Sequence, residues 1–353
     1  MKQKIKTVLL VGALVSAGLQ APVHATQSKK EPVHSAKKAP ASGKSTVRAA
    51  AGKQNVAKSS KSTKSESRVA AKPAVSKMAA AESARKPIRR VSTNFDDDAG
   101  RLALYSASAL VLDQATGHAI VEKQPNAVTP IASISKLMTA MVMLDAKLDL
   151  QEVISIGDED VDTLKGTRSR LPVGTTMTRE TALLLALMSS ENRAAHALGR
   201  HYPGGLRAFV EAMNKKAQAL GMYNTRFEEP TGLSSNNVST AHDLARMVTA
   251  AARYPEIRQA STTAEAKVEL NGRIRDFHNT NALVRSDNWE IGVSKTGYIS
   301  EAGRCLVMQA RVAERPVVIV LLDSNGKMTR VGDANRIKRW MESAGVAQER
   351  RPA

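Results

Sequence analysis

The chain has 353 residues, of which 42% are hydrophobic, and it carries 52 Lys and Arg against 33 Asp and Glu. The positive excess lies almost entirely in residues 1–95, which hold 20 basic and 3 acidic residues, whereas 96–353 hold 32 and 30. Because the folded region is nearly neutral, the overall positive charge is not evidence for a nucleic-acid-binding function.

The N-terminus has the layout of a secretory signal peptide. Lys2, Lys4 and Lys6 precede an apolar stretch over 7–19, and 21–25 offers small residues for cleavage after Ala25. The alternative is a membrane anchor, but the apolar run is shorter than the roughly 20 residues that span a bilayer. We therefore expect 1–25 to be removed and the protein to be exported to the periplasm, soluble or peripherally associated with the wall, without a stable membrane anchor.

Residues 26–95 are rich in Lys, Ala, Ser and Pro, with 17 basic and 3 acidic residues. Such a composition buries too little apolar surface to offset the entropy of ordering, so we expect disorder. This segment either makes loose electrostatic contact with anionic wall polymers or serves as a solvated spacer. The folded domain is expected over 96–353.

Helix and strand signals in this domain occur in two groups. We expect a hairpin of 109–113 with 118–121, helices starting near Ile131, Thr178 and Thr240, strands over 293–299, 305–312 and 317–322, and a last helix over 333–343. The first helix, 131–148, is apolar on nearly every face, which is typical of a helix inside a protein. Early and late strands together predict one sheet with edge strands from both ends of the domain. The only cysteine, Cys305, lies in a strand-like run and is expected to be a small buried side chain.

Ser133 and Lys136 lie one helical turn apart near the start of the first helix, so their side chains share a face. A serine hydroxyl becomes a good nucleophile when a neighbouring base takes its proton, and a lysine can be that base if burial favours its neutral form. The same spacing also follows Ser35, Ser83 and Ser324. The first two fall in the basic segment and the third in an expected turn over 323–326, so only Ser133 has a core around it.

Two further short patterns are informative only in combination. Ser190-Glu191-Asn192 follows the second helix, where Ser and Asn could equally cap the next one. Lys295-Thr296-Gly297 lies in the first late strand and is expected to open it. There the Lys and Thr could hold a carboxylate while the Gly lets a substrate backbone approach.

The three patterns occur in the order and spacing of a known superfamily, with gaps of 57 and 105 residues. The sequence resembles the penicillin-binding proteins and serine β-lactamases, and among them the low-molecular-mass DD-peptidases of the S11 type. The similarity spans roughly 101–343. It includes 130–140, Pro230-Thr231-Gly232-Leu233, 239–245, and Lys295-Thr296-Gly297-Tyr298 before Glu301-Ala302-Gly303.

This resemblance implies an α+β protein of the β-lactamase/DD-peptidase-like fold. In that fold a five-stranded antiparallel sheet is flanked by helices and stands beside an all-helical lobe, with the active site between them. It also implies the site roles, which are: Ser133 the acylated nucleophile, Lys136 its base, Ser190 the proton relay to the leaving amine, Asn192 a substrate-backbone contact, Lys295, Thr296 and Gly297 further substrate contacts, and the backbone N–H groups of Ser133 and Tyr298 the oxyanion hole. No metal or cofactor is expected.

The resemblance further implies activity on peptidoglycan stem peptides and covalent inhibition by β-lactam antibiotics. Only 56 residues follow Gly297, so no second β-rich domain is expected, as in the penicillin-binding protein 7 group of D-alanyl-D-alanine endopeptidases. Some carboxypeptidases of the family carry a basic residue directly before the stretch that corresponds to Asn281-Ala282-Leu283. This chain has Thr280 there, and the difference also favours cleavage of cross-links.

Three other functions remain open. A D-alanyl-D-alanine carboxypeptidase would use the same residues. A β-lactamase would need a second base for deacylation, and Glu228 and Glu229 are near in sequence, although Glu229-Pro230-Thr231-Gly232 follows the DD-peptidase pattern. A non-catalytic wall-binding protein would rely on 26–95, yet every side chain of the three patterns is present.

Overall fold

The computed structural model describes residues 102–349, with side chains described to Ser343. The predicted signal peptide and basic segment lie outside the described residues. Within the described part, no helix combines the length and the apolar character needed to cross a bilayer.

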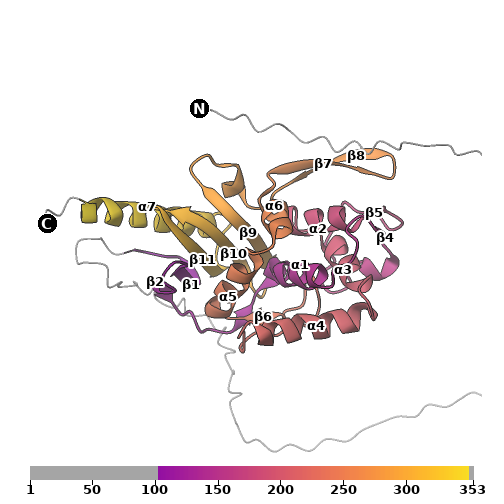
Figure 1. Cartoon of the computed structure of the whole chain (residues 1–353), viewed down its shortest axis with the longest axis horizontal. Helices are drawn as coiled ribbons and strands as arrows, with labels where there is room; N and C mark the ends of the chain where they lie inside the picture. The colour runs from indigo at the N-terminus through magenta and orange to yellow at the C-terminus, as the bar shows by residue number, and fades with distance from the viewer. Residues whose placement is uncertain (1–101, 350–353) are drawn as a thin grey trace, which may run out of the picture. The chain divides into compact units, whose positions relative to one another are not determined.

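Five strands form one antiparallel sheet in the order β2-β1-β11-β10-β9, as Figure 1 shows. The strands are β1 (Ser106–Asp113), β2 (Ala119–Lys123), β9 (Glu290–Ile299), β10 (Gly303–Val312) and β11 (Arg315–Ser324). The edge strands are therefore one early and one late segment, β2 and β9. This confirms the predicted five-stranded sheet and its two-ended origin.

The central strand β11 is buried on both faces. Its alternating side chains Val317, Ile319 and Leu321 share a core with α7 (Thr329–Glu349), while Val318, Val320 and Leu322 belong to the core on the opposite face. On that second face α5 (Ala241–Ala251) packs against β1, β10 and β11. The period of two along a strand thus divides the domain into a layer on each side of the sheet.

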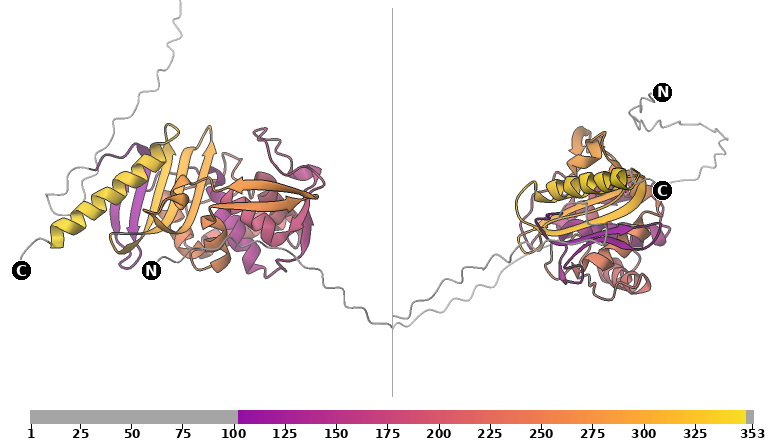
Figure 2. Two further views of the ribbon diagram at one scale, coloured as in Figure 1. Left: turned by 90° about the horizontal axis from the view of Figure 1, so that it is seen from above. Right: turned by 90° about the vertical axis from the view of Figure 1, so that its left-hand side faces the viewer.

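The remaining helices form a lobe beside the sheet, seen on the right of Figure 1 and in the left view of Figure 2. The lobe surrounds α1 (Lys136–Asp145), in which every side chain from Lys136 to Met143 is buried. Its other elements are η1 (Ala132–Ser135), η2 (Asp158–Asp160), α2 (Arg179–Met188), α3 (Asn192–Arg200), α4 (Gly205–Ala219), α6 (Pro255–Thr262), and the short strand pairs β3 (Thr129–Pro130) with β6 (Val238–Ser239), β4 (Val153–Ser155) with β5 (Thr176–Thr178), and β7 (Glu265–Leu270) with β8 (Arg273–His278). The short turn η3 (Ala282–Arg285) instead places Leu283 in the core between the sheet and α7.

Four local predictions need correction. The helix expected from Ile131 is a 3-10 turn followed by α1, and the last helix begins at Thr329. The Lys295-Thr296-Gly297 pattern lies within β9 because the strand already pairs with β10 from Glu290. Ser324 is not in a turn: it is the buried last residue of β11, and its hydroxyl bonds to that of Ser106 across the strand pair.

One buried carboxylate ties the first strand to the last helix. Asp333 on α7 is fully buried and accepts hydrogen bonds from the backbone N–H groups of Tyr105 and Ser106, at 3.0 and 2.7 Å, and from the Ser106 hydroxyl. Arg336 on the same helix donates to its other oxygen at 2.6 Å. Removing the carboxylate takes the acceptor from the two backbone N–H groups and from Arg336, whereas the Ser106 hydroxyl keeps that of Ser324 as a partner.

We therefore expect Asp333→Ala to lower the free energy of unfolding by about 3 kcal/mol, because it leaves buried N–H groups and an arginine without a partner. Chemical denaturation followed by circular dichroism measures this. Asp287→Ala, at an exposed position, is the matched control and is expected to change stability by less than about 0.5 kcal/mol. Equal stabilities of the two variants would contradict this structural role of Asp333.

Candidate active site

Ser133 lies in η1, the turn that precedes α1, and Lys136 is the first residue of α1. The Lys136 ammonium nitrogen lies 2.9 Å from the Ser133 hydroxyl oxygen. Ser133 is half-buried, whereas Lys136 is fully buried. The spacing argument from the sequence is thus confirmed in geometry, even though Ser133 is not itself part of the α-helix.

Two carbonyl oxygens complete the surroundings of the Lys136 nitrogen. It donates to the side-chain oxygen of Asn192 at 2.7 Å and to the backbone oxygen of Thr231 at 2.6 Å. Burial lowers the pKa of Lys136 to about 7, although the charges of Glu229 and Glu191 act in the opposite direction. The amine is therefore available as a base near neutral pH.

The second lysine of the site lies on β9. Lys295 is buried, and its nitrogen lies 3.0 Å from the Ser190 hydroxyl and 2.8 Å from the Thr296 carbonyl oxygen. Burial sets its pKa well below the ordinary lysine value, and the nearby charges of Lys136 and Arg330 lower it further. Two buried lysines thus each face a serine hydroxyl from a different segment.

Neither Ser190 nor Asn192 caps α3, so the helix-cap alternative is wrong. The residue that precedes α3 is Glu191, and its side chain makes no capping bond. Ser190 has a positive φ of 61°, a sparsely populated conformation for a residue with a side chain. Its hydroxyl bonds to Lys295 and not to a helix end.

Two glycines let separate segments approach the backbone around Ser133. A Cβ on Gly232 would lie 1.9 Å from the carbonyl oxygen of Ala132, and one on Gly297 would lie 3.0 Å from the Ser133 nitrogen. Gly232 also has a φ of +82°. This closeness brings β9 beside the Ser133 N–H, where the resemblance expects the Tyr298 N–H to complete an oxyanion hole.

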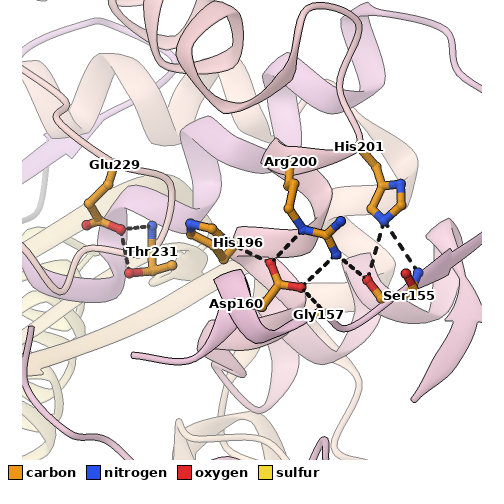
Figure 3. Close-up of polar contacts among 8 residues, drawn as sticks. All are labelled: Ser155, Gly157, Asp160, His196, Arg200, His201, Glu229 and Thr231. Atoms are coloured by element: carbon orange, nitrogen blue, oxygen red, sulfur yellow. Dashed lines mark hydrogen bonds and ion pairs between the residues drawn. The ribbon is translucent and has the colours of Figure 1, made fainter. Parts of the chain in front are cut away.

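The turn that carries Thr231 is built by a carboxylate. Glu229 accepts hydrogen bonds from the backbone N–H groups of Thr231 and Gly232, both at 2.6 Å, and also from the Thr231 hydroxyl, as Figure 3 shows for Thr231. Both oxygens of Glu229 are used in this way. The turn fixes the Thr231 carbonyl that holds Lys136, a contact that no side-chain pattern in the sequence indicates.

Thr296 and Thr280 meet at the far end of the site. The Thr296 hydroxyl donates to that of Thr280 at 2.7 Å, and the Thr280 backbone N–H donates to the Met188 carbonyl at the end of α2. The Thr280 side chain is otherwise exposed. The position that is basic in some carboxypeptidases therefore lies directly beside the third pattern.

The sequence predicts no role for Arg330, and the family resemblance assigns one only to the backbone N–H of Tyr298. Arg330 of α7 donates to the carbonyl oxygens of Gly297 and Cys305, at 2.9 and 3.1 Å, and so adds a positive charge behind Lys295. The exposed Tyr298 side chain carries the Arg304 guanidinium over its ring at 4.5 Å. Cys305 is buried as predicted, and burial raises the pKa of its thiol to about 11.

Within residues 102–349 no cluster of His, Cys, Asp and Glu is arranged to hold a metal ion.

Comparisons with known proteins point to one family. The family model of the S11 peptidases, described as D-alanyl-D-alanine carboxypeptidase, matches residues 95–326. The chain is 51% identical over 245 residues to a D-alanyl-D-alanine endopeptidase of Pseudomonas aeruginosa, covering 69% of this chain and 79% of that protein. It is 46% identical over 275 residues to the protein of the same name in Escherichia coli, covering 77% and 84%. The crystal structure of the Streptomyces K15 DD-transpeptidase superposes with a TM-score of 0.63 at 26% identity, over 69% of this chain and 98% of that one.

Proposed function

The chain belongs to the S11 family of D-alanyl-D-alanine peptidases, and we propose that it is a serine DD-peptidase acylated at Ser133 by peptidoglycan stem peptides. The observation that carries this assignment is the Lys136 amine, buried and 2.9 Å from the Ser133 hydroxyl.

In acylation the neutral Lys136 amine takes the proton of Ser133 while the serine oxygen attacks the carbonyl carbon of the penultimate D-Ala. The resulting oxyanion faces the backbone N–H groups of Ser133 and Tyr298. The carbon–nitrogen bond then breaks, and the leaving amine receives a proton from Ser190, which is replenished by Lys295. Water then attacks the ester carbonyl carbon, the Ser133 oxygen leaves and takes back its proton from Lys136, and the proton lost by water restores the one that Lys295 gave up.

Asn192, Thr296 and Gly297 bind the substrate in this proposal. The Asn192 side chain holds the substrate backbone, and the Thr296 hydroxyl with Lys295 provides hydrogen bonds and positive charge for a carboxylate. Gly297 lets β9 lie close to Ser133, since a Cβ there would come within 3.0 Å of the Ser133 nitrogen, and an extended peptide is proposed to bind along β9 beside it.

Fluorescent penicillin tests the nucleophile. We expect Ser133→Ala to abolish covalent labelling, whereas Ser35→Ala and Ser83→Ala keep it. The label is expected to persist for long times, because both oxygens of Glu229 accept bonds from its own turn and are not free to activate water. Labelling that survives in Ser133→Ala, with the protein folded by circular dichroism, would remove the assignment.

The pH dependence tests the base. The neutral form of Lys136 is the one that accepts a proton, and because burial lowers its pKa to about 7, the cation prevails below that pH. We expect kcat/KM for a soluble peptide to fall as the pH drops below about 7, approaching tenfold per pH unit. A profile that stays level down to about pH 5 would contradict a lysine base with this pKa.

We assign cleavage of D-alanyl cross-links as the main reaction and release of terminal D-Ala as the minor one. The acyl-enzyme is the same in both, so the preference depends on the leaving group. A terminal D-Ala leaves with a carboxylate beside its amine, which a strong cationic site favours. The neutral Thr280 next to Thr296 leaves that site with less charge, and both relatives of highest identity described above are named endopeptidases.

Thr280→Arg is expected to shift this preference. A guanidinium at this exposed position adds a charge beside Thr296, so the KM for a pentapeptide should fall about threefold, while cleavage of a cross-linked dimer should not improve. Thr280→Gln is the control of comparable size without charge. Chromatography of equal amounts of dimer and pentapeptide measures both reactions, and faster loss of D-Ala than splitting of dimer by the unmodified protein would make it a carboxypeptidase.

We also propose export to the periplasm through a signal peptide over 1–25, because the peptidoglycan substrate lies on the wall side of the cytoplasmic membrane. In this proposal 26–95 is a basic segment that either contacts anionic wall polymers loosely or serves as a solvated spacer, and 96–353 is the catalytic domain. The near neutrality of 96–353 supports this division, because the wall-directed charge is then confined to one segment.

A further inference from the structure

The 161–170 loop is held at both ends. Its start is bonded to α3, and its end is bonded to Glu191, the residue before α3. At its start the buried Asp160 bonds to His196 at 2.7 Å and to Arg200 at 2.8 Å, as Figure 3 shows. At its end Ser169 and Arg170 donate to Glu191, at 2.7 and 2.9 Å. The loop is therefore held against the segment that contains Ser190 and Asn192.

Asp162 organises the inside of this loop. Its carboxylate accepts hydrogen bonds from the backbone N–H groups of Leu164, Lys165 and Thr167 and, at 2.6 Å, from the Thr167 hydroxyl. Burial alone would raise the pKa of Asp162, but these hydrogen bonds lower it, so the group is ionised at neutral pH. An ionised carboxylate only accepts, so the single hydroxyl proton of Thr167 points to Asp162.

The direction of that proton determines what Thr167 can offer to Asn192. The Thr167 oxygen has only lone pairs left, and it accepts from the Asn192 amide nitrogen at 3.0 Å. The amide oxygen of Asn192 then faces Lys136, 2.7 Å from its nitrogen. A line of one-directional hydrogen bonds thus connects Asp162 through Thr167 and Asn192 to Lys136.

We propose that Asp162 and Thr167 are positioning residues that hold the Asn192 amide with its oxygen toward Lys136, so that the lone pair of the neutral amine faces Ser133. This rests on the proposed role of Lys136 as the base. The neutral amine has two N–H donors and one lone pair. The carbonyl oxygens of Asn192 and Thr231 take the two donors, and the Ser133 hydroxyl is the remaining neighbour.

A flipped Asn192 amide would reverse this arrangement. Its NH2 group would then face the amine and bind the lone pair that Ser133 needs, and the two donors of Lys136 would have one acceptor fewer. Nothing in Lys136 itself prevents the flip once it is neutral, since a neutral amine both donates and accepts. Thr167, with its proton committed to Asp162, accepts only the unflipped form.

The test is the rate of acylation of the full-length protein by fluorescent penicillin. Thr167→Val removes the acceptor while keeping the shape of the side chain, and we expect it to lower the second-order rate about tenfold, the loss of about one net hydrogen bond. Thr167→Ser restores the hydroxyl and should stay within about twofold of the unmodified protein. Thr163→Val, an exposed threonine of the same loop, should leave the rate unchanged.

A double-mutant cycle separates positioning from general disturbance of the loop. In an Asn192→Ala background there is no amide to orient, so Thr167→Val should have no further effect. The inference is overturned if Thr167→Val acylates like the unmodified protein, or if it slows acylation equally in both backgrounds. Failure of the unmodified protein to be labelled at Ser133 would instead overturn the proposed function, and the inference with it.

Discussion

The amine of Lys136 has to be buried beside Ser133, and a buried amine needs acceptors from the segments around it. An unpaired ammonium in the interior is costly, so the fold brings the Asn192 amide and the Thr231 carbonyl to it. The positive φ of Ser190, the turn built by Glu229 and the close approach of Gly232 are all found on the two segments that supply these acceptors. Of these features only the φ of Ser190 is a strained conformation, because a glycine adopts a positive φ freely, and it lies in the segment that brings Asn192 to Lys136.

How much of the fold could be predicted depended on whether its cause was local. The hairpin of β1 and β2, the start of α2 at Thr178 and the largely apolar α1 each carry their signal in a few neighbouring residues, and each is present. The β7–β8 hairpin also had a local signal, Asn271-Gly272 with positive φ at both residues, which was overlooked. The 3-10 turn at Ser133 had none, because it is shaped by the approach of backbone segments distant in sequence.

The site divides in the same way. The three motif patterns predicted which side chains gather, since Lys136 contacts Ser133 and Asn192 while Lys295 contacts Ser190. Thr231 was noted only as part of a family-like segment and Thr167 not at all, because one acts through a backbone carbonyl and the other lies in an irregular loop outside the three motifs. A pattern of residue types identifies the groups that react, but it does not identify the hydrogen-bond acceptors that only orient them.

The second lysine shows how two buried amines can lie in one site. Arg330 is held on the carbonyl oxygens of Gly297 and Cys305, so its charge is fixed behind β9, where it adds to burial in lowering the pKa of Lys295. The charge of Lys136 lowers the pKa of Lys295 further, so protonating one of the two amines makes it harder to protonate the other. In the proposed mechanism this coupling is useful: a proton that arrives on Lys136 from Ser133 makes Lys295 a stronger acid. The proton that Ser190 passes to the leaving amine is then released most readily after acylation has begun.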